Sequence, residues 1–495
     1  MAYYMRLRHL FILRSLLKLV AAKKYLMKKI VLALLLSPVL SYGQLTISLV
    51  QDIVSGTASG TPRTLTLHNG DMYMYAGAPG SRELYRYDGS NCSMVQDFNP
   101  GGDIDTLALG GTMLSHNGIL YLMGNNGVTG REMCKYDGTT MTAMSDIFPG
   151  IGSSNAAGFT VLGDKIYFRA QDTIFSEEIW GYNLQTGVTA IVHDEPTANG
   201  FPMGFTIFNN KFYFSGFDAN VGHELRCYNP QGNSYTLIQD INPGFFDAMP
   251  GGLVVVNGKL YFFAKSDTHG REIYEYTGTG TPTRLTDINP GTADGVLNST
   301  GLNLYNNAFY FNGNSGTADS LFKYDLQTGN ISVVYNKPGR DFEIFGGKLY
   351  FTAEYSPYGK ELCVYDGNTV SMVQDLNPGA AGSDIWDKTI YNNEMYFMAI
   401  TAATGAELYK LTDAALAVPA VSAADEITIY PNPAGNQLNV TSGVQISKLE
   451  VFSVTGQLLV SEMPMSRSAT VDISGLASGV YLVKVNGEVK KLVVE

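Results

Sequence analysis

The stretch Leu253–Ile288 reads LVVVNGKLYFFAKSDTHGREIYEYTGTGTPTRLTDI and contains one complete copy of a unit that recurs along most of this chain. Short apolar runs in it are separated by polar turn residues, which is the pattern of consecutive β-strands. Asn257 and Gly258 accept the positive φ angles that a two-residue hairpin needs. The stretch therefore predicts four antiparallel strands joined by tight turns.

The third run of this unit recurs eight times, and it opens with an acid in every copy except the sixth. The copies begin at Glu83, Glu132, Glu178, Glu224, Glu272, Ser320, Glu361 and Glu407, at intervals of 49, 46, 46, 48, 48, 41 and 46 residues. A repeat of this length that contains only strands and turns is typical of the blades of a β-propeller. We predict an all-β chain with an eight-bladed β-propeller over residues 44–411. The alternative is seven blades plus an irregular one, because the sixth copy is short and lacks the acid.

The two ends of the repeat region complement each other. Leu45–Ile53, with the sequence LTISLVQDI, matches a lone outer strand such as Ser93–Phe98, while the last copy stops at Leu411 without an outer strand. A closed ring pairs the two edges that would otherwise be exposed. We therefore expect the amino-terminal strand to complete the eighth blade.

A second motif lies between repeats, for example Gln96–Gly101 with the sequence QDFNPG. Proline fixes φ and the following glycine accepts a left-handed conformation, so the motif predicts a turn from the outer strand of one blade to the inner strand of the next. The aspartate is expected to cap this turn.

The first 43 residues differ from the rest because they carry eight basic residues and no acid. Lys28 and Lys29 precede the apolar run Ile30–Leu36, and small residues end at Gly43. This is the layout of a secretory signal peptide, and it predicts that residues 1–43 are removed and that translation starts at Met27. A membrane anchor is the alternative, but the run is short for a bilayer. We expect no integral membrane segment after cleavage.

Removal of this leader leaves a net charge of about −20, because all eight of its charges are basic. An acidic surface repels phosphate backbones, so nucleic acid is not expected as a partner.

The repeat acids Glu83, Glu132, Glu178, Glu224, Glu272, Glu361 and Glu407 could form a ring of carboxylates or hold each blade together. An active site needs a few unlike groups that converge on one point, whereas these acids recur once per blade. A structural role is therefore the prediction. Basic residues directly precede several of the acids and suggest charge-assisted hydrogen bonds between blades. They are Arg82, Arg131, His223, Arg271 and Lys360.

No catalytic, cofactor-binding or metal-binding residue is predicted, because the histidines are scattered and the cysteines lack metal-ligand spacing. A calcium site built on Asp103 and Asp105 is the alternative. The cysteines are interpreted as core residues, with a disulfide between neighbouring repeats as the alternative. They are Cys92, Cys134, Cys227 and Cys363.

The strings ELYRYDG from Glu83, EMCKYDG from Glu132 and ELCVYDG from Glu361 resemble the ELWxxDGT repeat family of secreted bacterial proteins. The resemblance covers residues 45 to about 411, and tyrosine or cysteine usually stands in the tryptophan position. It implies an extracellular repeat protein and no particular catalytic residue.

Residues 412–426 are rich in alanine and valine and are interpreted as a linker. Residues 427–495 show alternating strands that predict a small Ig-like β-sandwich. This segment resembles the type A carboxy-terminal sorting domain of the type IX secretion system. The resemblance rests on Tyr430, Pro431, Asn432, Pro433, Gly456, Gly479, Tyr481, Lys490 and Lys491. It implies the type IX machinery as a partner and a location outside the cell or on the outer-membrane surface, reached through the periplasm.

These observations favour a monomeric ligand-binding or adhesion module for a glycan or a surface protein. A glycan-active hydrolase or lyase and a structural surface component are the alternatives. The sequence does not specify the ligand or the face of the propeller that binds it.

Overall fold

The computed structural model describes residues 45–104, 113–173, 177–194, 200–298, 301–414 and 427–495, apart from residues 447, 454–457, 463, 465 and 487. The leader and most of the linker lie outside these residues. The chain divides into two compact units, Met1–Leu416 and Ala417–Glu495. In the described residues, every regular element is a strand.

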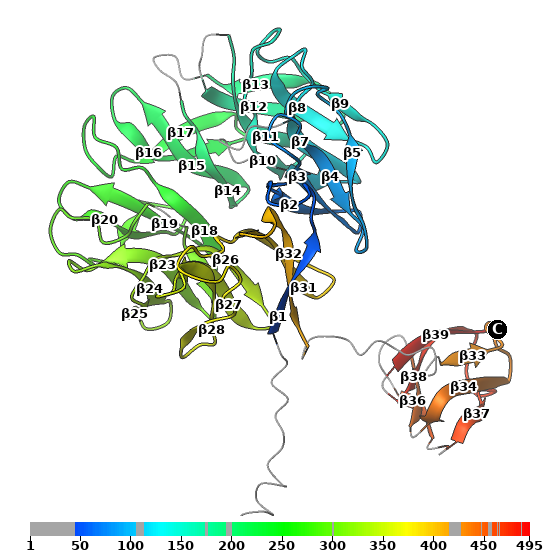
Figure 1. The fold of residues 1–495 in the computed structure, drawn as a ribbon. Helices are drawn as coiled ribbons and strands as arrows, with labels where there is room; N and C mark the ends of the chain where they lie inside the picture. Colours follow the sequence, from blue (N-terminus) through cyan, green and yellow to red (C-terminus); the bar gives the residue numbers. More distant parts are fainter. Residues whose placement is uncertain are drawn as a thin grey trace, which may run out of the picture. The chain divides into compact units, whose positions relative to one another are not determined.

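The first unit contains eight four-stranded antiparallel sheets, one for each repeat, and the shortened sixth repeat forms such a sheet as well. Figure 1 shows them arranged about a centre, with first strands such as β14 and β18 near the middle and later strands such as β16 and β20 toward the rim. The all-β propeller is therefore confirmed. The strands of the first four sheets are β2 (Arg63–His68), β3 (Asp71–Ala76), β4 (Glu83–Tyr87) and β5 (Cys92–Gln96); β6 (Met113–His116), β7 (Ile119–Asn125), β8 (Arg131–Tyr136) and β9 (Met141–Ala143); β10 (Ala157–Leu162), β11 (Lys165–Gln171), β12 (Glu177–Asn183) and β13 (Thr189–His193); and β14 (Met203–Phe208), β15 (Lys211–Asp218), β16 (Gly222–Asn229) and β17 (Ser234–Gln239). The other four contain β18 (Gly251–Val256), β19 (Lys259–Ser266), β20 (Gly270–Tyr276) and β21 (Thr283–Arg284); β22 (Asn303–Tyr305), β23 (Ala308–Asn314), β24 (Asp319–Asp325) and β25 (Ile331–Tyr335); β26 (Gly339–Phe345), β27 (Lys348–Glu354), β28 (Lys360–Tyr365) and β29 (Val370–Met372); and β30 (Trp386–Tyr391), β31 (Glu394–Thr401), β32 (Gly405–Asp413) and β1 (Leu45–Gln51).

Tight turns join the first and second strands of the sheets. Asn257 and Gly258 have φ angles of 50° and 73°, so both central residues of this hairpin are left-handed, as the sequence predicts. Such turns place the apolar second strand directly beside the first.

The apolar core lies between neighbouring sheets. Phe262 of β19 is fully buried in a cluster that also contains Tyr213 of β15 and Leu225 of β16, from the preceding sheet. Phe311, Phe351 and Phe397 are likewise fully buried in the second strands of the next three sheets. Burial of one such side chain contributes about 1.5–3 kcal/mol, so each interface between sheets stabilises the ring.

The amino-terminal strand β1 forms the outer strand of the eighth sheet. It pairs antiparallel with β32, with Leu45 opposite Asp413 and the buried Ile47 opposite Leu411. This pairing extends β32 to Asp413, beyond the predicted end of the propeller at Leu411. The two ends of the propeller sequence therefore lie in one sheet.

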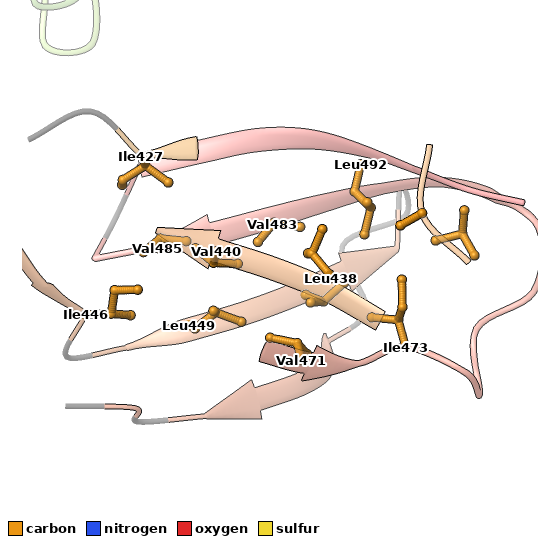
Figure 2. Close-up of a cluster of buried hydrophobic side chains, with 13 residues drawn as sticks. Ile427, Leu438, Val440, Ile446, Leu449, Val471, Ile473, Val483, Val485 and Leu492 are labelled. Carbon is orange, nitrogen blue, oxygen red and sulfur yellow. The ribbon is translucent and has the colours of Figure 1, made fainter. Parts of the chain in front are cut away.

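The second unit contains two sheets. The first is formed by β33 (Thr428–Tyr430), β34 (Gln437–Ile446) and β37 (Ser466–Asp472), and the second by β36 (Leu458–Glu462), β35 (Leu449–Ser453), β38 (Gly479–Val485) and β39 (Glu488–Val494). Their facing side chains, among them Leu438, Val471 and Val483, form one buried cluster (Figure 2). The confirmed small β-domain is thus a two-sheet sandwich.

Among the described residues, no helix has the length and apolar character needed to cross a membrane.

Candidate functional site

Each repeat acid is buried and accepts hydrogen bonds from the chain segment that leads to the next sheet. At Glu224, Oε2 accepts from the backbone N–H of Ile241 at 2.9 Å and Oε1 accepts from that of Asn242 at 3.1 Å. Glu83 accepts from Phe98 and Asn99 in the same way, at 3.1 and 3.2 Å. The seven acids lie in seven different sheets, so they do not converge on one site.

Burial shifts the pKa of these acids. It raises the pKa of Glu83 and of Glu224 to about 7, although the backbone N–H groups partly offset this effect. The carboxylates therefore act as paired acceptors for a buried turn, and removal from water is the main cause of the raised pKa.

Glu407 in β32 closes the ring through the same contact. Its carboxylate accepts from the backbone N–H groups of Ile53, Val54 and Gly60 at 2.8, 3.3 and 2.6 Å. These residues follow β1, so the eighth sheet obtains both its outer strand and its connecting turn from the amino terminus.

Two of the basic residues before the repeat acids bind other carboxylates, whereas Arg131 donates to the Asn155 amide oxygen at 3.0 Å. Arg82 donates to Asp103 at 2.7 Å, and Arg271 donates to Asp294 at 2.9 Å. Each aspartate lies in the segment that connects the sheet to the next one along the chain. The ion pairs therefore hold these connecting segments beside the repeat acids. The motif aspartate caps its turn as predicted: Asp240 Oδ2 accepts from the Gly244 N–H at 3.3 Å.

The sixth sheet uses a different arrangement because Ser320 replaces the acid. Asn312 of β23, which is buried, donates to the Gly339 carbonyl at 2.8 Å and accepts from the Gly339 N–H at 2.9 Å. Only residues 336–338 connect β25 to β26, whereas residues 240–250 connect β17 to β18.

A cleft of about 770 Å³ lies beside this short connection, which contributes Pro338 to the lining. It extends over the sixth, seventh and eighth sheets, at the starts of their first strands. Its lining residues are Gly301, Asn303, Asn312, Pro338, Gly339, Arg340, Asp341, Phe342, Thr352, Ala353, Glu354, Lys360, Trp386 and Asp387.

Trp386 and Arg340 form one wall of the cleft. The Arg340 guanidinium carbon lies 3.7 Å from the centroid of the Trp386 ring, within the range of a cation–π contact. Asp384 binds both side chains, through an ion pair with Arg340 and a 3.3 Å hydrogen bond from Trp386 Nε1. The aromatic ring is therefore held in place by Arg340 and Asp384.

A buried ion pair lies behind the lining residue Asp341 of the cleft. Lys388 Nζ donates to Asp341 Oδ2 at 2.9 Å, to the Asp341 carbonyl at 2.8 Å and to Thr352 Oγ1 at 2.9 Å. Burial lowers the pKa of Lys388, and the adjacent Asp341 opposes this effect. A charge buried in this way requires all of these partners, so they fix Asp341 in the cleft.

The backbone is strained at the same place. Asp341 and Asp387 have φ angles of 52° and 56°, and Thr64 in the neighbouring first sheet has 58°. The corresponding position in β14 and β18 is occupied by Gly204 and Gly252. A non-glycine residue in this region costs on the order of 1–3 kcal/mol, and such strain is concentrated at functional sites. Burial also raises the pKa of Asp387.

None of the cleft residues was identified as a site residue from the sequence. The available signals were the short sixth interval, the missing acid, and the triplets GRD and WDK at Gly339–Asp341 and Trp386–Lys388 where other repeats have glycine. Trp386 is also one of only two tryptophans in the chain.

Other candidates from the sequence lie apart from the cleft. All four cysteines are free, so the alternative of a disulfide is wrong, and three of them are buried core residues. Asp103 is paired with Arg82, and Asp105 lies outside the described residues. In the described part of the chain, no group of three or more histidine, cysteine or acidic side chains is arranged to hold a metal ion.

Part of the sorting-domain motif joins the segment after β33 to β39. Asn432 donates to the Lys491 carbonyl at 2.8 Å and accepts from the Val493 N–H at 2.8 Å, which ties the Tyr430–Pro433 segment to β39. Gly479 begins β38, and the Tyr481 hydroxyl donates to the Ala477 carbonyl at 2.7 Å. Lys490 lies in β39, and Gly456 lies outside the described residues.

Residues 428–495 match the secretion system C-terminal sorting domain family. This segment is thus a type IX sorting domain, which directs the chain to the cell surface or the extracellular space. No curated protein matches the chain in sequence.

Several solved structures resemble the chain at low sequence identity. PorZ, a surface component of the type IX secretion system of Porphyromonas gingivalis, is 14% identical with a TM-score of 0.43, over 86% of this chain and 64% of PorZ. A puromycin-hydrolysing peptidase of Mycobacterium tuberculosis is 12% identical with a TM-score of 0.43, over 73% and 61%. The propeller domain of the trilobed protease of Pyrococcus furiosus is 12% identical with a TM-score of 0.37, over 72% and 95%. The chain spans less than two thirds of the first two structures.

Proposed function

We propose that this protein is a binding or adhesion module that holds a glycan or a protein ligand in the cleft over the sixth to eighth blades. The observation that carries the proposal is the cleft itself, where a shortened connection, the fixed Trp386–Arg340 wall and two strained aspartates occur together. Ligand sites combine an apolar or aromatic wall with a few placed polar groups, and this cleft has both.

The export route supports a role outside the cell. In this proposal the leader directs the chain into the periplasm, the type IX machinery recognises residues 427–495, and the monomeric propeller is the exported cargo. The repeats are proposed to be of the ELWxxDGT type, because seven keep the leading acid and several keep the Asp-Gly turn.

A second candidate is a glycan-active hydrolase or lyase. Asp341 and Asp387 line the same cleft in different environments: Asp341 is paired with Lys388, whereas burial raises the pKa of Asp387. Two carboxyl groups that differ in this way can serve as base and acid.

The test uses the chain from Gln44 to Glu495 on glycan and protein arrays, with and without chelator. We expect a saturable ligand whose affinity falls at least tenfold in Trp386→Ala, and no effect of the chelator. Trp180→Ala is the matched control, because it changes the other tryptophan, which does not line the cleft. A ligand insensitive to Trp386→Ala would contradict the proposed site. Consumption of a bound glycan, lost in Asp387→Asn, would favour the enzyme, and absence of any ligand would favour a structural surface component.

A further inference from the structure

A groove of about 480 Å³ lies between the third and fourth sheets, away from the Trp386 cleft. Lys165, the first residue of β11, lines it just after the turn that follows β10, and Asn183 lines it from the end of β12. The cleft, by contrast, lies at the starts of the first strands. The groove is therefore a separate site, and its volume is within the range of ligand pockets.

Gly181 of β12 distinguishes this groove from the equivalent position in the other sheets. The other seven sheets have a side chain at this position of the third strand, namely Arg86, Lys135, Cys227, Glu275, Lys323, Val364 and Lys410. A Cβ atom on Gly181 would lie 2.9 Å from Val192 Cγ2 and 3.7 Å from Lys165 Cδ. The lysine stem therefore lies beside bare glycine backbone inside the groove.

The fifth sheet shows what a side chain at this position does. There the residue is Glu275, whose two carboxylate oxygens accept from Lys259 Nζ at 2.9 and 3.0 Å. Lys259 is the first residue of β19, as Lys165 is the first residue of β11. The first and eighth sheets also hold an ion pair at these two positions. The third sheet thus keeps the lysine and has Gly181 in place of the acid.

Lys165 forms no ion pair with any carboxylate of the described residues. The adjacent Asp164 accepts instead from Asn183 Nδ2 at 3.0 Å. An ammonium group has three donors and no acceptor, so neighbouring donors cannot satisfy it. Its strongest partner would be a carboxylate supplied from outside the chain.

Two further groups in the groove have donors to offer. Asn233 Oδ1 accepts from the Tyr228 hydroxyl at 3.0 Å, which leaves Asn233 Nδ2 to donate to a ligand. Thr186 Oγ1 accepts from the Val188 N–H at 3.4 Å, which leaves the hydroxyl proton to donate. A ligand that complements the groove must therefore present acceptor oxygens.

We infer that this groove binds an acidic sugar, whose carboxylate pairs with Lys165 as Glu275 pairs with Lys259. The inference goes beyond the proposed function and does not depend on the Trp386 cleft.

The rest of the lining favours a sugar over a peptide. Sugar hydroxyl and ring oxygens can accept from Asn233 and Thr186. Val188 and Ile191, which are 58% and 40% exposed, offer an apolar wall to the C–H face of a sugar ring. A peptide would bring backbone N–H groups that need acceptors, whereas the groove offers donors.

The first test removes the charge of the lysine. Lys165→Met keeps most of the stem and removes the ammonium. Lys348→Met is the matched control, because Lys348 is the first residue of β27 and does not line the groove. The second test supplies an internal carboxylate. Ala190 is exposed, lines the groove and lies opposite Gly181, so Ala190→Glu should occupy Lys165, and Ala190→Gln is its uncharged control.

The probes are oligosaccharides of uronic acids, the same oligosaccharides with their carboxyl groups reduced to alcohols, and short acidic peptides. Each is titrated by calorimetry into the chain from Gln44 to Glu495. We expect a uronate to bind and to lose at least tenfold in affinity when its carboxyl groups are reduced. Lys165→Met should weaken it at least tenfold and Lys348→Met should not. Ala190→Glu should weaken it at least tenfold more than Ala190→Gln, and added salt should weaken it in the native chain.

Other outcomes would overturn the inference. They are equal binding by Lys165→Met and the native chain, equal binding of the reduced oligosaccharide, preference for acidic peptides, and no binding of any uronate. A uronate that is lost in Trp386→Ala but kept in Lys165→Met would also overturn it, and would support the cleft of the proposed function. A uronate that is lost in Lys165→Met but kept in Trp386→Ala supports the groove even if the cleft binds nothing. Thermal unfolding of each variant shows that a loss of binding is not a loss of fold.

Discussion

Glu224 shows how one buried carboxylate can hold two parts of a propeller together. Its two oxygens accept from consecutive backbone N–H groups of the turn that leaves the same sheet. Those N–H groups are buried and would otherwise lack partners, which costs about 1–3 kcal/mol for each. The glutamate therefore recurs from repeat to repeat because the turn that needs its two acceptor oxygens recurs as well.

Replacement of Glu224 by alanine should destabilise the propeller by about 1–3 kcal/mol or more, since the Ile241 and Asn242 N–H groups lose their acceptors. Chemical denaturation measures the change. Ser320→Ala is the control at the equivalent position, where the hydroxyl makes only a 3.4 Å bond to the Ala318 carbonyl. Equal losses in the two variants would contradict this role.

The raised pKa values predict a pH dependence of stability. Burial raises the pKa of Glu83 and Glu224 from 4.5 to about 7, so the folded state binds protons more tightly than the unfolded state. Their contribution is fully present below pH 4.5 and is lost as the pH rises through 7. We expect the melting temperature of the native chain to rise relative to Glu224→Gln between pH 8 and pH 5. Parallel profiles would show that Glu224 does not titrate in this range.

Strain at Asp387 should cost stability. Asp387→Gly removes a side chain from a φ of 56° and should stabilise the propeller by about 1 kcal/mol while it weakens ligand binding. The reciprocal control is Gly204→Asp at the matching position of β14, where φ is 72° and a Cβ would meet no atom within 4 Å. That change should destabilise by about 1–3 kcal/mol. A stability loss in Asp387→Gly would mean that the aspartate is needed for folding.

Among the elements, β1 closes the ring by pairing with β32. Without residues 44–54, β32 would lose its outer neighbour and Glu407 would lose the Ile53 and Val54 N–H groups. We expect this truncated chain to aggregate, as unpaired edges do, and light scattering with circular dichroism would detect it. Removal of residues 415–495 should leave the propeller soluble. A soluble monomer with unchanged melting temperature after loss of β1 would refute the closing role.

Most of the strands could be predicted from the sequence because their signals are local. Asn257-Gly258 and the QDFNPG motif specify turns through allowed φ angles, and the apolar runs between them specify strands. The pairing of β1 with β32 is distant, yet the unmatched halves at the two ends of the repeat region contain its signal. Local conformational preferences and the sequence repeat were together sufficient to predict the propeller.

The cleft could not be predicted because no local pattern specifies it. It lies beside the short connection after the sixth repeat, and its walls come from positions as distant in sequence as Asn303, Arg340 and Trp386. The partners of Arg82 and Arg271 were also obscured, since the nearest acid in sequence is already satisfied by backbone N–H groups and the arginines bind Asp103 and Asp294 instead. Ion pairs of this kind depend on how distant parts of the chain fold together, so the sequence alone does not identify the partners.

On the scale of the whole molecule, the two compact units have separate cores. Calorimetry of the chain from Gln44 to Glu495 should therefore show two transitions, because each unit buries its own apolar surface. Deletion of residues 427–495 should abolish one transition and change the melting temperature of the other by less than about 2 °C. A shift of that size corresponds to only a small change in the free energy of unfolding. One merged transition that shifts on deletion would indicate coupled units.

The pairing within the eighth sheet has a further consequence for presentation at a cell surface. Leu45 and Asp413 lie opposite each other at one end of this sheet, near the turn between Tyr391 and Glu394, while Trp386 pairs with Met398 toward the other end. The chain therefore leaves the propeller from the face opposite the cleft. If the proposed function holds, a cargo tethered through its carboxyl-terminal side would keep the face with the cleft turned to the medium, where passing molecules can reach it unobstructed by the attachment.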